Sequence, residues 1–159
     1  MQKNLSPEEH YKSLPKKRSG SSVLFLNEKG ELLIVKPSYK SGWLPVGGTV
    51  DDSESPSVAA QRETREEIGL DLILSDFKII SICYVPEKDA RTEAFQFAFF
   101  GGVLSNEQIS QIKLPSDELE EFRFVPLEEA KTMLSPRLSD KLDLYLEVAR
   151  DKKVVYLES

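Results

Sequence analysis

A single α/β (α+β) domain is the fold that this sequence predicts. Three observations support it. Segments with the two-residue alternation of strands are interspersed with segments of helical periodicity, the length of 159 residues suits one ordinary domain, and neither an internal repeat nor a linker divides the chain. We therefore expect one domain over residues 19–159, preceded by a polar leader over residues 1–18.

The leader is polar and ends in three consecutive basic residues, Lys16, Lys17 and Arg18. We expect a solvated segment or a short helix there rather than a binding patch. Strand character begins at Ser21: SSVLFLN and ELLIVK predict two strands, joined by a tight turn that contains Gly30. The stretch PSYKSGWLPVGGTVDD then predicts a loop, because prolines and glycines interrupt it repeatedly.

A helix is predicted from Pro56 to Ile68. Ser55 is suited to cap its N-terminus, proline is tolerated at the first helical position, and Gly69 suits a left-handed C-terminal cap. The remaining elements are predicted in order as strands over 77–85, 92–104 and 118–127, and helices over about 126–134 and 140–150.

Composition excludes several classes of function. The net charge of −6 argues against a nucleic-acid partner, since phosphate backbones are bound by clustered lysines and arginines. The single cysteine, Cys83, and single histidine, His10, exclude an internal disulfide and Cys/His zinc sites, and disfavour Ser-His and Cys-His triads. No apolar run approaches the roughly 20 residues that span a membrane, and the start lacks the hydrophobic segment of a secretory signal. We expect a cytoplasmic protein with no membrane partner.

The predicted helix presents a cluster of carboxylates. Glu63, Glu66 and Glu67 fall within an arc of about 100° on one helical face. Like charges at i and i+4 destabilise a helix by about 0.2–0.5 kcal/mol, and a divalent cation would remove that penalty. Carboxylate ligands without nearby His or Cys suit Mg²⁺, with Mn²⁺ also acceptable. Taken alone, the same pattern also fits a solvated face with pairs such as Arg62 to Glu66.

A wider spacing favours the metal site. Residues 48–70, GTVDDSESPSVAAQRETREEIGL, resemble the Nudix box: a Gly, five residues, a Glu, seven residues, then Arg-Glu-hydrophobic-x-Glu-Glu-x-Gly. Its seven fixed positions are filled by Gly48, Glu54, Arg62, Glu63, Glu66, Glu67 and Gly69. Thr64 stands where an aliphatic residue is usual, but it falls on the packing stripe Ala60, Thr64 and Ile68. The resemblance extends over about residues 19–150.

The resemblance implies a fold and a set of roles. The fold would be an α/β/α sandwich around a mixed sheet, with the box as a loop-helix-loop at the active site. The metal ligands would be Glu63, Glu66, Glu67 and the carbonyl of Gly47. Arg62 would orient the carboxylates by pairing with Glu54, and Gly48 would support the same loop. Glu66 and Glu67 would act in catalysis, together with a carboxylate from a later loop. For that residue we choose Glu121 first and Glu118 second.

The activity implied is Mg²⁺-dependent hydrolysis of the diphosphate linkage in a small nucleoside diphosphate derivative, by attack of water on phosphorus. Pro86 lies 16 residues past Leu70, a spacing that slightly favours ADP-ribose or a nucleotide sugar, although a proline that simply ends a strand explains it equally well. A nucleoside triphosphate pyrophosphohydrolase of the oxidised-nucleotide type and a non-catalytic ligand-sensing module are the alternatives. A homodimer through the leader or a sheet edge is allowed.

Overall fold

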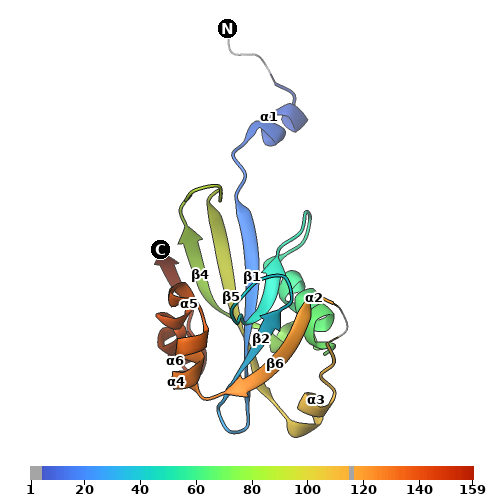
Figure 1. The fold of residues 1–159 in the computed structure, drawn as a ribbon. Coiled ribbons are helices and arrows are strands. Elements are labelled where there is room, and N and C mark those ends of the chain that lie inside the picture. Colours follow the sequence, from blue (N-terminus) through green and yellow to red (C-terminus); the bar gives the residue numbers. More distant parts are fainter. Residues whose placement is uncertain (1–4, 115–116) are drawn as a thin grey trace.

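Figure 1 shows the fold in a computed structural model, which describes residues 5–114 and 117–159. Within these residues a seven-stranded mixed sheet has the order β6-β2-β1-β5-β4-β7, with β3 paired to β1. The strands are β1 (Arg18–Asn27), β2 (Leu32–Pro37), β3 (Val46–Thr49), β4 (Lys78–Val85), β5 (Ala94–Leu104), β6 (Leu119–Val125) and β7 (Val155–Glu158). The helices are α1 (Pro7–Ser13), α2 (Pro56–Ile68), the 3₁₀ turn η1 (Leu74–Asp76), α3 (Asn106–Ser110), α4 (Leu127–Met133), α5 (Pro136–Ser139) and α6 (Leu142–Arg150).

Strand β1 is the centre of the sheet. It pairs with β5 in parallel over its full length, from Arg18 opposite Ala94 to Asn27 opposite Leu104. On its other side it pairs antiparallel with β3 over its first half and with β2 near its end. Because β3 and β2 pair with different parts of β1, both lie beside the central strand. The loop from β3 to α2 therefore begins near the middle of the sheet rather than at its edge.

Helices cover both faces of the sheet, and the side chains of β1 and β2 alternate between them. Phe25 and Leu33 face the core cluster that contains Ala60 and Ile68 of α2. Leu24 and Ile34 face the opposite cluster, which α4 and α6 close with Ala130, Leu142, Tyr145 and Val148. Burial on both faces explains why VLFL and LLIV are continuous apolar runs. The predicted three-layer α/β/α arrangement is confirmed.

Two predictions about local structure were wrong. Residues 46–49 were expected to be loop, but they form β3, because Val46 to Thr49 pair with Val23 to Gly20 of β1. No strand was expected after the last helix, yet β7 adds to the sheet edge in parallel with β4. Both strands have only four residues and obtain their hydrogen bonds from distant segments, so neither has a periodicity that a local pattern reveals.

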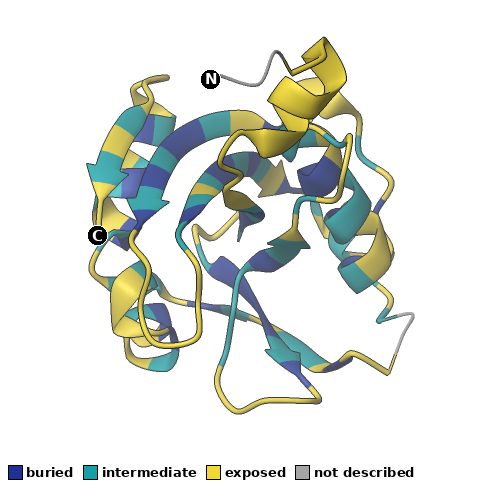
Figure 2. Cartoon of the chain, turned by 90° about the horizontal axis from the view of Figure 1, so that it is seen from above, coloured by how far each residue is buried: buried dark blue, intermediate teal, exposed yellow. Residues whose placement is uncertain are grey.

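The N-terminal segment contains the short helix α1, which is exposed along its whole length (Figure 2). Ser6 begins it with a capping box, since its hydroxyl accepts from the Glu9 N–H and the Glu9 carboxylate accepts from the Ser6 N–H. No helix of the described residues is long and apolar enough to cross a membrane.

Candidate active site

Helix α2 carries most of the residues that the sequence singled out, and local chemistry determines its ends. The Ser55 hydroxyl accepts from the Val58 N–H at 3.3 Å, and Gly69 ends the helix with a φ of 72°. Its buried stripe, as predicted, contains Ala60, Thr64 and Ile68, together with Ala59. The Thr64 hydroxyl donates to the Ala60 carbonyl at 2.7 Å, so the polar group at this usually aliphatic position is satisfied.

Arg62 is the centre of the polar network above this helix. Its Nε and Nη2 donate to the two oxygens of Glu54 at 2.9 Å each, a bidentate pair. Its Nη1 donates to Glu63 at 2.8 Å and to Glu66 at 3.0 Å, and Nη2 also reaches the Thr49 carbonyl at 2.9 Å. Arg62 therefore ties the loop before the helix to two of the three predicted metal ligands, and it holds the pKa of Glu54 down at about 2.

Glu67 lies on the inner side of the cluster, against β3. One carboxylate oxygen accepts from the Gly47 N–H at 2.8 Å. Burial raises the pKa of Glu67 to about 7, against the lowering effect of that hydrogen bond, and the nearby charges of Glu63, Glu118 and Glu66 add to the rise. The carboxylate thus sits where its charge is unfavourable unless a cation is present.

The two glycines of β3 allow the helix and the sheet to approach this closely. Gly47 has a φ of 144°, and a Cβ there would lie 2.1 Å from the Ser21 carbonyl oxygen. A Cβ on Gly48 would lie 2.3 Å from a carboxylate oxygen of Glu63. The side chain of Glu63 is only 14% exposed, and burial raises its pKa despite the contact with Arg62. Side chains at either glycine would therefore displace the acidic cluster or the strand.

The donor set suits a hard divalent cation. Three carboxylates from one helical face lie beside a glycine-rich backbone, and the described residues provide neither a histidine nor a thiol beside them. In this conformation no three acidic, His or Cys side chains of the described chain converge closely enough to enclose an ion. The contacts above explain this, because Arg62 holds oxygens of Glu63 and Glu66 while the Gly47 N–H holds Glu67. Binding a metal would require these carboxylates to exchange partners.

The structure places the two later-loop candidates differently. Glu121 lies in β6 opposite Lys36, and its carboxylate accepts from the Arg123 Nε at 2.5 Å, which lowers its pKa. Glu118 lies just before β6, where its carbonyl accepts from the Ser38 N–H at 2.8 Å. Its charge contributes to the raised pKa values of both Glu63 and Glu67, whereas the carboxylate of Glu121 is paired with Arg123.

A depression of about 330 Å³ is lined in part by Gly47 and Gly48, and none of its other lining residues was assigned a site role from the sequence. Gln96 of β5 forms part of its floor and lies across Gly20, where a Cβ would come within 2.4 Å of the carboxamide oxygen. Gln96 also lines an adjoining, more apolar hollow of about 290 Å³ with Phe97 and Tyr145. These residues come from strands and helices far apart in the chain, so no sequence spacing could have grouped them.

The sequence contains four aromatic residues that could stack on a base, Trp43, Tyr84, Phe95 and Phe97, and the structure places them differently. Phe97 borders the apolar hollow, but it packs against the core cluster that contains Phe25 and Ile68. Trp43 packs into the opposite core cluster beneath Arg123, whose guanidinium carbon lies 4.9 Å from the indole ring centre. Tyr84 and Phe95 contact each other at 5.8 Å between ring centres, and the Tyr84 hydroxyl donates to Glu93. We therefore keep none of the four as a stacking candidate.

The chain belongs to the Nudix family, since the family model described as NUDIX domain matches residues 16–145. An uncharacterized Nudix hydrolase of Listeria monocytogenes is 33% identical over 119 residues, a match that covers 71% of this chain and 66% of that relative. The chain thus spans slightly less than two thirds of the length of this curated relative. The MutT protein from Methanosarcina mazei Go1 is similar in structure, with a TM-score of 0.65 and 27% identity over 85% of this chain and 97% of that one.

The NUDIX domain of Shewanella oneidensis NrtR, solved in complex with ADP ribose, is a further structural relative. It has a TM-score of 0.66 and covers 94% of each chain at 17% identity. At that identity the likeness shows the fold alone. Together these matches confirm the predicted fold class and the predicted family.

Proposed function

We propose that this chain is a Mg²⁺-dependent hydrolase that cleaves the diphosphate linkage of a nucleoside diphosphate derivative. The observation that carries the proposal is the buried Glu67, which accepts a hydrogen bond from the Gly47 backbone and whose burial, together with the charges of Glu63, Glu118 and Glu66, raises its pKa to about 7. This cluster of carboxylates does not favour stability, because each ionised neighbour raises the free energy needed to ionise the next carboxylate. A divalent cation with a bound diphosphate neutralises the cluster.

In this proposal Glu63, Glu66 and Glu67 hold the metal, with the Gly47 carbonyl as a further ligand. When bound, the ion polarises the phosphoryl oxygens and lowers the pKa of the attacking water. Arg62 does not reach the substrate; it positions two of the carboxylates and the loop before the helix. Glu118 is our first choice for the carboxylate that accepts the proton of the attacking water, and Glu121 is the second.

The depression beside Gly47 supports a nucleotide as the substrate. It combines backbone groups of β3 with the neighbouring apolar hollow, which Pro45 and Tyr145 also line. ADP-ribose or a nucleotide sugar, and a nucleoside triphosphate of the oxidised type, are the candidates that this arrangement accepts. Pro86, which directly follows β4, ends that strand and also lines a neighbouring cavity, so its position supports both explanations considered for it.

A ligand-sensing module that has lost catalysis is the second candidate function, and the complete acidic cluster speaks against it. Isomerisation of a diphosphate through a cysteine nucleophile is disfavoured because Cys83 is buried in β4, with 2% of its surface exposed.

We expect the protein to hydrolyse at least one compound of a panel of nucleoside diphosphate and triphosphate derivatives in Mg²⁺, measured as release of phosphorylated products. Release should disappear in EDTA and return when Mg²⁺ is added in excess. The identity of the products, separated by ion-exchange chromatography, shows which anhydride bond was cut. Absence of turnover across the panel, combined with metal-dependent ligand binding, would instead support the sensing module.

Metal binding should also depend on pH. The pKa of Glu67 rises from 4.5 in the unfolded chain to about 7 in the folded protein, so its neutral form is favoured by folding. The metal-free protein should therefore lose stability as pH rises from about 4.5 through 7. Mg²⁺ requires the ionised form, so we expect its stabilising effect on Tm to be larger at pH 8 than at pH 6. Thermal unfolding with and without Mg²⁺ tests this, and a Mg²⁺ effect independent of pH would contradict it.

A further inference from the structure

A strongly basic cavity of about 550 Å³ lies next to the depression beside Gly47. Five basic side chains line it: Arg18, Lys40, Lys88, Arg91 and Arg137. Asp89 is the one acidic residue among the described residues of its lining. The chain as a whole carries a net charge of −6, so the cavity has a local field of the opposite sign to the rest of the molecule.

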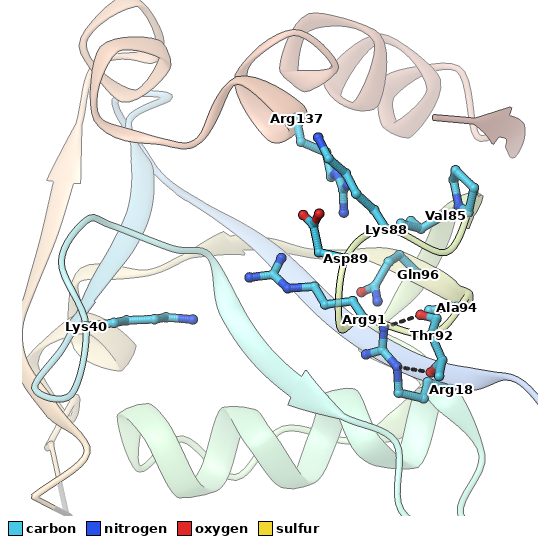
Figure 3. Close-up of a pocket in the computed structure, with 11 residues that line it drawn as sticks. Arg18, Lys40, Val85, Lys88, Asp89, Arg91, Thr92, Ala94, Gln96 and Arg137 are labelled. Carbon is cyan, nitrogen blue, oxygen red and sulfur yellow. Dashed lines mark hydrogen bonds between the residues drawn. The ribbon is translucent and has the colours of Figure 1, made fainter.

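The basic groups converge from separate elements (Figure 3). Lys40, in the loop between β2 and β3, and Arg91, in the loop between β4 and β5, extend toward one another across the space, and Arg137 enters from α5 on another side. Arg18 is held in place by Thr92, since its Nε donates to the hydroxyl at 2.9 Å.

The converging charges form no ion pair with a carboxylate among the described residues, although Asp89 lines the same cavity. In the described part of the chain no salt bridge joins Lys40, Lys88, Arg91 or Arg137 to an acidic side chain, and Asp89 forms none either. Like charges that face one another around a shared space repel, and an anion placed between them would convert the repulsion into attraction. The cavity is therefore suited to a multiply charged anion.

The cavity is continuous with the candidate active site. Arg18, Lys40 and Gln96 line both this cavity and the depression beside Gly47 and Gly48. The two spaces differ in chemistry. The depression contains Gly47 and Gly48, which lie against Glu67 and Glu63, whereas cations line the cavity and suit an anion directly. A ligand whose diphosphate lies at the acidic cluster would extend its remaining part toward the basic side.

We propose that the basic cavity binds a phosphate group of the substrate other than the diphosphate that is cleaved. This inference rests on the proposed function and narrows its substrate class. The substrate would be a nucleoside diphosphate derivative with a further phosphate, either as an ester on its distal part or as an extension of the phosphate chain. ADP-ribose without a further phosphate, and nucleotide sugars whose sugar carries no phosphate, would then be poorer substrates.

The first test measures anion binding without catalysis. Inorganic tripolyphosphate is titrated by calorimetry into the metal-free full chain in EDTA at constant ionic strength. The variant Arg91→Gln/Arg137→Gln removes two cations of the cavity, and both side chains are exposed, so folding should be retained. The control Lys29→Gln/Arg150→Gln removes the same charge from exposed positions outside the cavity. We expect roughly tenfold or greater loss of affinity in the first variant only, the scale of a lost charge-assisted contact. Equal affinities, or an equal loss in the control, would overturn the proposal.

The second test asks whether the anion belongs to the substrate. Values of kcat/KM are compared within matched pairs that differ by one phosphate: ADP-ribose with its 2′-phosphate ester, and a nucleoside diphosphate with its triphosphate. We expect the wild type to have the higher kcat/KM for the compound with the additional phosphate in at least one pair. Arg91→Gln/Arg137→Gln should abolish that preference by lowering kcat/KM for this compound, while kcat/KM for the compound without the additional phosphate stays unchanged. Absence of a preference, or its survival in the variant, would show at most a site for free anions and would overturn the substrate assignment. If no compound is hydrolysed, the proposed function fails, whereas the titration still decides whether the cavity binds anions.

Discussion

Replacement of Glu67 by glutamine should lower kcat at saturating Mg²⁺ by about 10²- to 10³-fold, the scale seen when one group that stabilises transition-state charge is lost. Glutamine has nearly the same shape and keeps an oxygen that can accept from the Gly47 N–H, now 2.8 Å from the carboxylate. It removes the negative charge that burial and three neighbouring carboxylates make unfavourable. The metal-free variant should therefore be as stable as the wild type or more stable, even as activity is lost.

Steady-state kinetics and thermal unfolding of the same preparation separate these effects. Glu107→Gln is a suitable control, because Glu107 is an exposed acidic residue in the first turn of α3. It removes the same charge and should retain wild-type kinetics. Full activity of Glu67→Gln on a true substrate would refute the role assigned to this residue, and a large fall in Tm would make its role structural.

Replacement of Arg62 by lysine should affect both stability and activity. The Arg62 side chain is 21% exposed, and its guanidinium forms a bidentate pair with Glu54 while also reaching Glu63 and Glu66. Lysine keeps the charge but not the planar arrangement of donors, so the contacts with Glu54 and the Thr49 carbonyl are lost together. We expect a loss of about 2 kcal/mol in the free energy of unfolding, the scale of a broken charged hydrogen bond, and at least tenfold lower kcat/KM.

The matched control lies on the same helix. Arg65 is exposed, and no side-chain contact of it appears in the described structure, so Arg65→Lys tests the substitution without the network. Urea unfolding and kinetics on both variants give the comparison. Similar behaviour of the two variants would mean that the contacts of Arg62 are dispensable. Added Mg²⁺ should recover part of the stability of Arg62→Lys, because the ion can also hold Glu63 and Glu66 in place.

The acidic helix could be predicted in detail because its determinants are local. The hydroxyl of Ser55, the proline after it and the left-handed Gly69 act within one or two turns of the backbone, so they appear in the sequence as a fixed spacing. The buried stripe follows the helical repeat, and the pairing of Arg62 with Glu54 spans only eight residues. For these features, distance along the chain is a sufficient guide to distance in space.

The surroundings of residues outside the helix depend on strand register, which is not local in sequence. Glu121 was chosen before Glu118 from the sequence alone, and the register of β6 against β2 places Glu121 opposite Lys36 and beside Arg123. The ion pair with Arg123 depends on where the strand begins and on which neighbour it acquires. A sequence pattern gives neither the start of the strand nor its neighbour, so it could not decide between Glu118 and Glu121.

By itself the sequence determined the family, the secondary structure of most elements and the acidic face of α2, since each depends on neighbours within a few helical turns or on an unbroken strand pattern. The tertiary structure alone decided the rest. It decided that residues 46–49 pair with β1 and that Glu67 is buried against Gly47. It also brought Arg18, Lys40, Arg91 and Arg137 together around one cavity from four separate segments. The physical reason is that burial and electrostatic fields depend on distance through space, which only the folded sheet defines.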